Sequence, residues 1–349
     1  MTGPAPARRV LVVRGDNDGD VLITGPAIRA VAAHADEVLM LCGPRGQHAA
    51  ALLPGVDRVL TWPAPWLDPE PAPVTRADID AVVNRLGGLG LDEAVIFTSF
   101  HQSPLPLALL LRMAGVARVS AISEDYPGSL LDVRHHVPAG VPEPLRALSL
   151  AQTAGFTPPV TDDGRLAVRR PLPPVGHLTG TLPYVVVHPG ASVPARSWPA
   201  PNAAATVAAL AGAGHRVLVT GSPAETALTA TVAGDFGVNL GGRTTLAELA
   251  AVLDGAACVV VANTGPAHLA AAVGTPVVSL FAPTVPAAQW APYGVPVVLL
   301  GDQDAPCRGT RARVCPVPGH PCLTGVGPAE VLAAVAGITD QPAWAKVAV

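Results

Sequence analysis

The residues best suited to bind a ligand lie in one turn: Asn263, Thr264, Gly265, Pro266 and His268. The surrounding sequence, CVVVANTGPAHLAAAVGTPVVSLFAP, predicts a buried strand, a tight turn, a short helix that begins at Pro266, and a second buried strand. Such a turn places helix N–H groups and the positive end of the helix dipole beyond the end of the strand, where a phosphate binds well. An ordinary βα turn has the same pattern, so the turn alone does not decide between the two interpretations.

Four further polar residues follow the first apolar run of the chain: Asp16, Asn17, Asp18 and Asp20. On the sequence alone, Asp20 is best interpreted as a helix cap, because Asp is favoured at that position. The spacing excludes an EF-hand, since the sixth and twelfth positions are Val21 and Ala27 rather than Gly and Glu. A loose magnesium site remains an alternative.

A third group of residues lies near the end of the chain: Cys307, Cys315, His320 and Cys322. These residue types bind zinc, but their spacing matches no common zinc finger or ribbon. The three cysteines are an odd number, so they do not imply a disulfide framework either. We expect them to be packing residues.

The elements that must position these residues alternate along the chain. Short apolar runs predict buried strands at residues 9–14, 37–42, 58–61, 94–98, 118–122, 165–168, 184–188, 216–220, 238–240, 258–262 and 276–281. Helical stretches lie between most of them, including one over residues 21–33. Strands that alternate with helices predict an α/β protein with doubly wound parallel sheets.

The chain is expected to contain two domains, because 349 residues exceed what one core usually supports. We predict an N-terminal domain over 1–170, a Pro-rich linker over 171–183, a C-terminal domain over 184–327, and a final helix and tail over 328–349. Residues 123–144 interrupt the alternation and read as a long binding loop. Two such domains leave a cleft that the loops after their strands can line.

Composition excludes several classes of protein. The net charge of −4 provides no global basic field, which argues against nucleic acid as a partner. No apolar run reaches the roughly 18 residues that a membrane span needs. The first residues, MTGPAPARRV, contain no separate apolar signal region, so we expect a cytoplasmic protein. No G-x-G-x-x-G follows a strand, which disfavours a dinucleotide-binding oxidoreductase.

Four segments together resemble glycosyltransferase family 9, the heptosyltransferase family. They are GDNDGDVLITGPAIRA, VVVHPGASVPARSWPAPNAAATVAAL, the block NLGGRTTLAELAAVLDGAACVVVANTGPAHLAAAVGTPVVSLFAPT, and CPVPGHPCLTGVGPAEVLAAV. The resemblance implies a GT-B fold, with two Rossmann-like domains facing across a cleft. It also implies inverting transfer of a sugar from a nucleoside diphosphate, as in the ADP-heptose enzymes of lipopolysaccharide core biosynthesis.

The resemblance assigns roles to single residues. Asp20 matches an aspartate taken as the general base, which accepts the proton of the attacking hydroxyl. Arg196 stands where the family usually has Lys, and its fork would meet the donor phosphates; a surface arginine is the alternative. Ser192 would offer a phosphate hydroxyl. Glu225 would accept ribose hydroxyls, although a Glu in the first turn of a helix is also common.

Two further assignments concern the second half. Thr245 lies where the family closes over the nucleotide base, but it is equally a plain helix cap. In the turn over residues 263–268, Asn263 departs from the family, which usually has Asp there. The amide keeps the turn geometry and removes a negative charge beside the diphosphate. His268 would bond a phosphate oxygen, as the motif match favours, or merely pack.

The resemblance implies no cofactor and no metal, because helix N-termini and basic side chains neutralise the diphosphate in GT-B enzymes. The expected partners are a nucleotide-sugar donor and a glycan or glycolipid acceptor. A glycolipid acceptor would bring the protein to the inner face of a membrane. Two alternatives stay open: a nucleotide-sugar epimerase of the same architecture, and a protein that binds nucleotide sugars without turnover.

Overall fold

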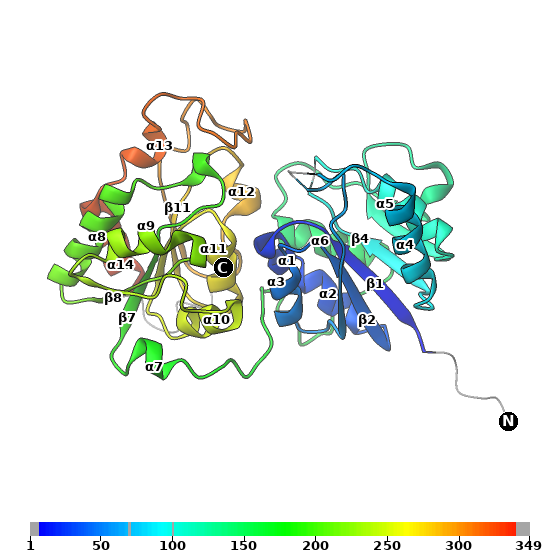
Figure 1. Ribbon diagram of the computed structural model, residues 1–349, viewed down its shortest axis with the longest axis horizontal. Helices are drawn as coiled ribbons and strands as arrows, with labels where there is room; N and C mark the ends of the chain where they lie inside the picture. Colours follow the sequence, from blue (N-terminus) through cyan, green and yellow to red (C-terminus); the bar gives the residue numbers. More distant parts are fainter. Residues whose placement is uncertain (1–6, 69–70, 100, 340–349) are drawn as a thin grey trace. The chain divides into compact units, whose positions relative to one another are not determined.

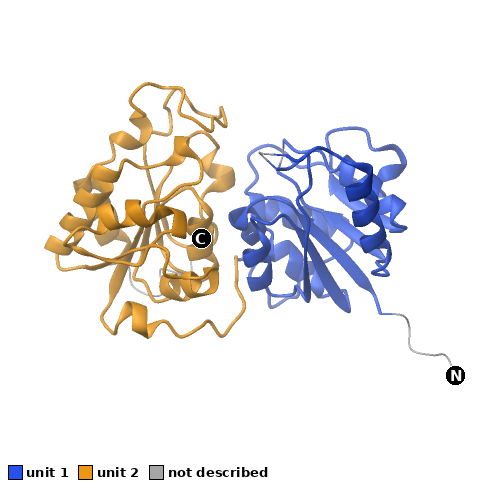
Figure 2. Cartoon of the chain, in the orientation of Figure 1, with its two compact units in different colours: residues 1–165 blue, residues 166–349 orange. Residues whose placement is uncertain are grey.

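The computed structural model describes residues 7–68, 71–99 and 101–339, and the chain divides into two compact units. Unit 1 is Met1–Arg165 and unit 2 is Leu166–Val349, coloured blue and orange in Figure 2. The segment predicted as a linker, 171–183, is grouped with unit 2. The tail predicted after the last helix, 340–349, lies outside the described residues.

The core of unit 1 is a six-stranded sheet in which neighbouring strands are parallel. Its strands are β1 (Arg9–Arg14), β2 (Glu37–Cys42), β3 (Arg58–Thr61), β4 (Glu93–Ile96), β5 (Arg118–Ile122) and β6 (Val133–His135). Their order across the sheet is β3-β2-β1-β4-β5-β6, the order of a Rossmann fold. Apart from charged residues at their ends, the central strands β1 and β4 are apolar because helices cover both faces.

Helices cover both faces of the unit 1 sheet (Figure 1). They are α1 (Asp18–Ile23), α2 (Gly25–Ala32), α3 (Gln47–Leu52), α4 (Arg76–Gly87), α5 (Leu105–Met113), α6 (Glu143–Thr153) and the 3₁₀ turn η1 (Gly128–Leu130). Helix α1 packs on α3 and α2 on α6, whereas α4 packs on α5. In Figure 1 these two groups cover opposite faces of the sheet. The face under α4 and α5 contains a continuous cluster of buried side chains, among them Leu11, Ile96 and Leu111.

Unit 2 repeats the same scheme. Its strands are β7 (Tyr184–His188), β8 (Arg216–Val219), β9 (Gly237–Asn239), β10 (Val259–Ala262), β11 (Val277–Leu280) and β12 (Val297–Leu300). Their order is β12-β11-β10-β7-β8-β9, again with parallel neighbours, so the first and fourth strands of the unit lie side by side at its centre.

The helices of unit 2 enclose a second hydrophobic core. They are α7 (Gly176–Thr179), η2 (Pro194–Arg196), α8 (Ala200–Gly212), η3 (Pro223–Glu225), α9 (Thr226–Ala233), α10 (Leu246–Asp254), α11 (Gly265–Ala272), α12 (Ala287–Trp290), α13 (Pro321–Thr324) and α14 (Pro328–Thr339). Val185, Val260 and Leu323 are buried in one cluster that extends to Ile338 in α14.

The structure corrects four predictions of secondary structure. Residues 165–168 are not a strand; Leu166 and Val168 are buried, but the segment pairs with no strand of the described chain. Residues 123–144 are not irregular throughout, because β6 extends the sheet beside β5. The helix predicted over 21–33 begins earlier, at Asp18, and is interrupted at Thr24, since Pro26 has no N–H to continue it. Strand β12 was not predicted.

Across the described ranges, no helix combines the length and the apolar character that crossing a bilayer requires.

Candidate active site

The predicted site residues gather at equivalent places in the two sheets. In each unit, the first and fourth strands are neighbours, β1 with β4 and β7 with β10. The chain leaves these two strands in opposite directions, so the loops after them separate at the carboxyl edge, where ligands of doubly wound sheets bind.

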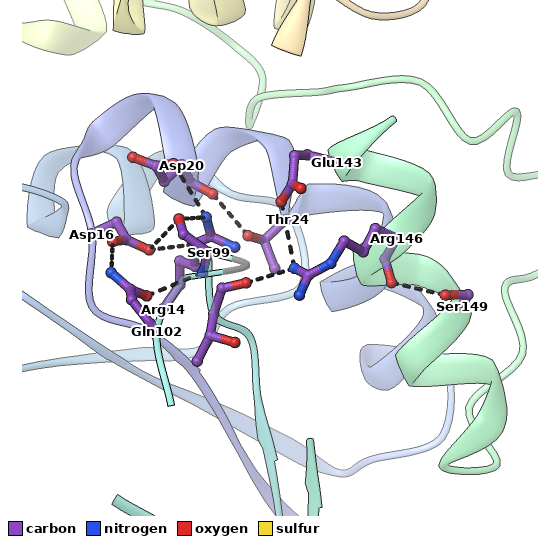
Figure 3. Close-up of polar contacts among 10 residues, drawn as sticks. Arg14, Asp16, Asp20, Thr24, Ser99, Gln102, Glu143, Arg146 and Ser149 are labelled. Carbon is purple, nitrogen blue, oxygen red and sulfur yellow. Dashed lines mark hydrogen bonds and ion pairs between the residues drawn. The ribbon is translucent and has the colours of Figure 1, made fainter. Parts of the chain in front are cut away.

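In unit 1, the buried side chain of Arg14 connects the two central strands. Arg14 ends β1 and is 2% exposed. Its Nε lies 2.8 Å from Asp16 Oδ2, and its Nη2 lies 3.1 Å from Asp20 Oδ1. The same Nη2 donates to Ser99 Oγ, which follows β4, at 2.9 Å (Figure 3). Arg14 therefore holds the acidic loop against the end of β4.

Asp20 lies in the first turn of α1, and Asn17 rather than Asp20 occupies the N-cap position. The capping interpretation of Asp20 is therefore wrong. Thr24 Oγ1 donates to the backbone oxygen of Asp20 at 2.8 Å, which satisfies a carbonyl at the point where α1 ends. The side chain of Asp20 is 20% exposed, so solvent and a substrate can reach it.

A second buried arginine extends this network from α6. Arg146 Nη1 donates to the backbone oxygen of Thr98 at 2.6 Å and lies 3.6 Å from Glu143 Oε2. Figure 3 shows both residues next to the group around Arg14. Burial lowers the pKa of Arg146, although Glu143 opposes this shift.

The carboxylates of this network keep Arg14 charged. Burial alone would lower the pKa of Arg14, but Asp16, Asp20 and Glu143 together outweigh it, and the pKa lies above its usual value. A guanidinium that cannot lose its proton is a fixed positive charge beside Asp20.

The carboxylates of the acidic loop bind separate protein groups. Asp16 accepts a hydrogen bond from Gln102 Nε2 at 2.5 Å, whereas Asp18 accepts one from the backbone N–H of Ala49 in α3. Burial raises the pKa of Asp18. Within the described part of the chain, no three His, Cys, Asp or Glu side chains are placed to hold a metal ion.

In unit 2, the turn after β10 begins α11 as predicted, one residue earlier, at Gly265. Thr264 is the N-cap residue and Pro266 lies in the first turn. Arg196, at the end of η2, donates from Nη1 to the backbone oxygen of Asn263 at 3.3 Å. The predicted cation and the predicted anion-binding turn are therefore in contact, although 67 residues separate them.

The amide of Asn263 bonds the end of the neighbouring strand. Its Oδ1 accepts from the backbone N–H of Ala282 at 3.4 Å, and its Nδ2 donates to the oxygen of the same residue at 3.5 Å. A carboxylate could make only the first bond, because it has no hydrogen to donate. The two hydrogen bonds to Ala282 thus explain why this chain has Asn263 where the resemblance leads one to expect Asp.

His268 is a buried residue in the first turn of α11. It is 7% exposed, and its Nδ1 has no hydrogen-bond partner among the residues that the structure describes. Burial, together with the nearby charge of Arg196, lowers the pKa of His268 to about 4. The imidazole is therefore neutral at pH 7 and can donate one hydrogen bond without carrying charge.

Glu225 is fixed beside the loop that follows β7. Its Oε2 accepts from the N–H and the hydroxyl of Ser222 at 2.8 and 2.7 Å, which is a capping box. A Cβ added to Gly190 would overlap Glu225 Oε1, so a side chain at position 190 would require the Glu225 carboxylate to move. Glu225 therefore has the structural role in the first turn of a helix that the sequence also suggested. Its other carboxylate oxygen, Oε1, lies against the 189–192 loop.

The remaining predicted residues have simpler surroundings. Thr245 is the N-cap of α10 and forms a capping box with Glu248. Ser192 is exposed in the loop after β7. The five cysteines are free thiols, and burial together with Cys307 raises the pKa of Cys322 to about 12. His320 Nε2 lies 3.1 Å from the backbone oxygen of Ala195.

Several residues of these networks were not identified from the sequence: Arg14, Asp16 as a partner of Arg14, Ser99, Gln102, Glu143, Arg146 and His188. The last of these is buried at the end of β7, with Nδ1 at 3.0 Å from Thr220 Oγ1, and burial lowers its pKa. The sequence contained one signal that could have identified some of them, a charged or polar residue at the end of an apolar strand, as at Arg14 and His188. Their partners come from distant segments, which spacing cannot reveal.

A cavity of about 860 Å³ lies at the opposite, amino edge of the unit 2 sheet. It is lined by residues 170–173 and by residues 254–257, where Arg170 and Asp254 form a two-bond ion pair at 2.7 Å. None of the predicted site residues lines it.

Comparison with protein families adds independent information. The family model described as glycosyltransferase family 9 (heptosyltransferase) matches residues 108–320. This range includes Arg196, Glu225 and the 263–268 turn, whereas Asp20 lies before it. No curated protein matched the chain.

Solved structures show the same fold. A family 9 glycosyltransferase from Veillonella parvula has a TM-score of 0.79 at 15% identity, covering 95% of this chain and 97% of that one. The ADP-heptose lipopolysaccharide heptosyltransferase II of E. coli has a TM-score of 0.68 at 20% identity, covering 95% and 98%. The E. coli heptosyltransferase WaaC with ADP has 0.66 at 21%, covering 94% and 97%. At these identities, the likeness establishes the fold alone.

Proposed function

Because the chain belongs to glycosyltransferase family 9 and has the GT-B fold, we propose that it moves a sugar from a nucleoside diphosphate to an acceptor hydroxyl with inversion at the sugar. That it is a glycosyltransferase follows from the family. The donor, the acceptor and the residue roles are our proposal. The donor is an ADP-linked heptose or a related sugar, as the ADP-bound relative suggests, and the acceptor is a cell-envelope glycan or another glycoconjugate.

One observation carries the proposal: Arg196, the start of α11 and the buried neutral His268 meet at the centre of the unit 2 sheet. A helix N-terminus and a guanidinium both favour a diphosphate. A neutral imidazole with an unused nitrogen can add a hydrogen bond. The oxygen of Glu225 that does not cap η3 can accept from a ribose hydroxyl.

In the proposed reaction, the acceptor oxygen forms a bond to the anomeric carbon while the bond from that carbon to the diphosphate oxygen breaks. The electron pair of the broken bond leaves with the diphosphate, whose growing charge Arg196 and the N-terminus of α11 stabilise. The proton of the acceptor hydroxyl passes to a carboxylate oxygen of Asp20. No metal or cofactor takes part in this scheme.

The test combines a binding screen with one substitution. Thermal unfolding is measured with ADP-, GDP- and UDP-sugars; a ligand at a hundred times its Kd stabilises the folded state by about 2.7 kcal/mol. The stabilising sugar is then labelled, and its transfer to envelope glycan acceptors is followed. We expect Asp20→Asn to abolish transfer and to leave the thermal shift nearly unchanged.

Three outcomes would contradict the proposal. Wild-type turnover in Asp20→Asn would exclude Asp20 as the base. Binding without transfer to any acceptor would indicate a silent binding protein, and conversion of the sugar without an acceptor would indicate an epimerase. Asp80→Asn, which removes an exposed carboxylate from α4, is the matched control.

A further inference from the structure

The described side chains around Asp20 contain more carboxylates than cations. Asp16, Asp20 and Glu143 share the guanidinium groups of Arg14 and Arg146, with the nearest nitrogen to oxygen distances between 2.8 and 3.6 Å. Arg14 is 2% exposed and Arg146 is 8% exposed, so water screens these charges weakly. Each carboxylate that shares a buried guanidinium offsets part of the stabilisation that the cation gives to the others.

The three carboxylates differ in their exposure and in their distances to the guanidinium groups. The side chain of Glu143 is 1% exposed and that of Asp16 is 13% exposed, whereas Asp20 is 20% exposed. Asp16 also lies closer to Arg14 than Asp20 does, at 2.8 against 3.1 Å. Asp16 further accepts hydrogen bonds from Gln102 and Ser99.

We propose that Asp16 is a positioning residue that occupies Arg14 and thereby keeps Asp20 basic enough to take the proton of the acceptor hydroxyl. An aspartate paired alone with a buried arginine is a poor base, because the cation stabilises its ionised form. The negative charge of Asp16 offsets part of that effect while Arg14 still orients Asp20. The inference rests on the proposed function, in which Asp20 is the base.

The other charged groups near Asp20 act less directly. Helix α1 packs against α3, α2 and α6. Asp18 and His48 lie together at the contact with α3, where Asp18 binds Ala49. Arg29 of α2 pairs with Asp162. Glu143 and Arg146 come from α6, and Glu124 near Arg146 faces His136. Asp16 is the carboxylate that binds the same guanidinium as Asp20.

The experiment measures the protonation of Asp20 directly and needs no substrate. The full-length protein is labelled with ¹³C in the aspartate carboxyl carbons, and its spectra are recorded over a pH series. The Asp20 signal is assigned by its loss in Asp20→Asn. In Asp16→Asn, we expect the titration midpoint of Asp20 to move to lower pH by about one unit, the size of effect that a nearby charge produces.

Further variants keep the result interpretable. Asp16→Glu retains the charge and should restore the wild-type midpoint, and Asp80→Asn should leave it in place. If Asp16→Asn does not fold, Glu143→Gln removes another carboxylate of the cluster and should move the midpoint in the same direction. A midpoint that is unchanged or higher in the folded variants would overturn the proposal.

Enzyme kinetics separate this inference from the function on which it rests. The acidic limb of the pH profile of kcat/KM should shift with the Asp20 midpoint in Asp16→Asn. If Asp20→Asn retains transfer, the proposed role of Asp20 as the base fails whatever the titration shows. If Asp20 is required but neither the midpoint nor the acidic limb moves in Asp16→Asn, only the role of Asp16 fails.

Discussion

At the scale of single residues, His268 combines a buried position with an uncharged ring. Its pKa of about 4, against a usual value of 6.5, follows mainly from burial and secondly from Arg196. The resemblance to the family predicted His268 as a phosphate contact. The sequence did not predict its charge state, because the charge depends on Arg196 and on the packing of the core.

This shift makes stability depend on pH. Between pH 6.5 and 4, the unfolded chain binds a proton at residue 268 and the folded protein does not. The free energy of unfolding should therefore fall as the pH falls through this window, by up to about 3 kcal/mol from this residue. Urea denaturation of His268→Gln at several pH values should show a weaker dependence than the wild type.

His188 adds an effect of the same sign, because burial lowers its pKa as well. Some pH dependence should therefore remain in His268→Gln. The exposed His177→Gln serves as the control and should follow the wild type. An unchanged pH dependence in His268→Gln would show that the folded ring is protonated like an exposed one.

At the scale of elements, the contact between Gly190 and Glu225 joins the loop after β7 to the start of α9. Glycine at position 190 leaves the space that the Glu225 carboxylate occupies, and a side chain there would displace that carboxylate. Ser222 holds the other oxygen of that carboxylate. The loops after the neighbouring strands β7 and β8 therefore together hold the Glu225 carboxylate in place.

Gly190→Ala should displace the Glu225 carboxylate and weaken binding of ADP. A hydrogen bond to a charged group contributes about 1.5–3 kcal/mol, so the Kd should rise roughly tenfold or more. Isothermal titration calorimetry measures this directly. Gly212→Ala, at a position where an added Cβ meets no atom within 4 Å, is the matched control. Wild-type affinity in Gly190→Ala would exclude Glu225 from the nucleotide site.

Elements were predicted best where the sequence itself contains their cause. Strands β1, β7 and β10 are unbroken apolar runs, and α11 begins where Gly265 and Pro266 permit a helix. Strand β6 was missed because it is short and largely polar, so its pairing with β5 identifies it rather than its composition. The 165–168 segment shows the converse. Its alternating apolar residues pack into the core, but the segment is not a strand of a sheet.

At the scale of the whole molecule, each unit has its own hydrophobic core and its own central pair of strands. The cores draw on separate parts of the chain, from Leu11 to Leu131 and from Val185 to Ile338. The repeated strand order explains why residues far apart in sequence meet. Arg14 reaches Ser99 and Arg196 reaches Asn263 because the first and fourth strands of each unit are neighbours.

Hydrogen exchange on the whole protein tests where the nucleotide binds. ADP should slow exchange in residues 188–192, 221–226 and 262–268, which follow different strands of unit 2 but lie at one edge of its sheet. Residues 170–173 and 254–257, which line the cavity at the opposite edge, should exchange as before. Protection of the second set without the first would place the nucleotide in that cavity.

The amide of Asn263 has a consequence for the end of each catalytic cycle. After transfer, the nucleoside diphosphate carries one more negative charge than the sugar-linked form did. A carboxylate at position 263 would repel that extra charge and speed departure, whereas the amide, bonded to Ala282, does not. With Arg196 beside it, the spent nucleotide should leave more slowly than it would if position 263 carried a carboxylate.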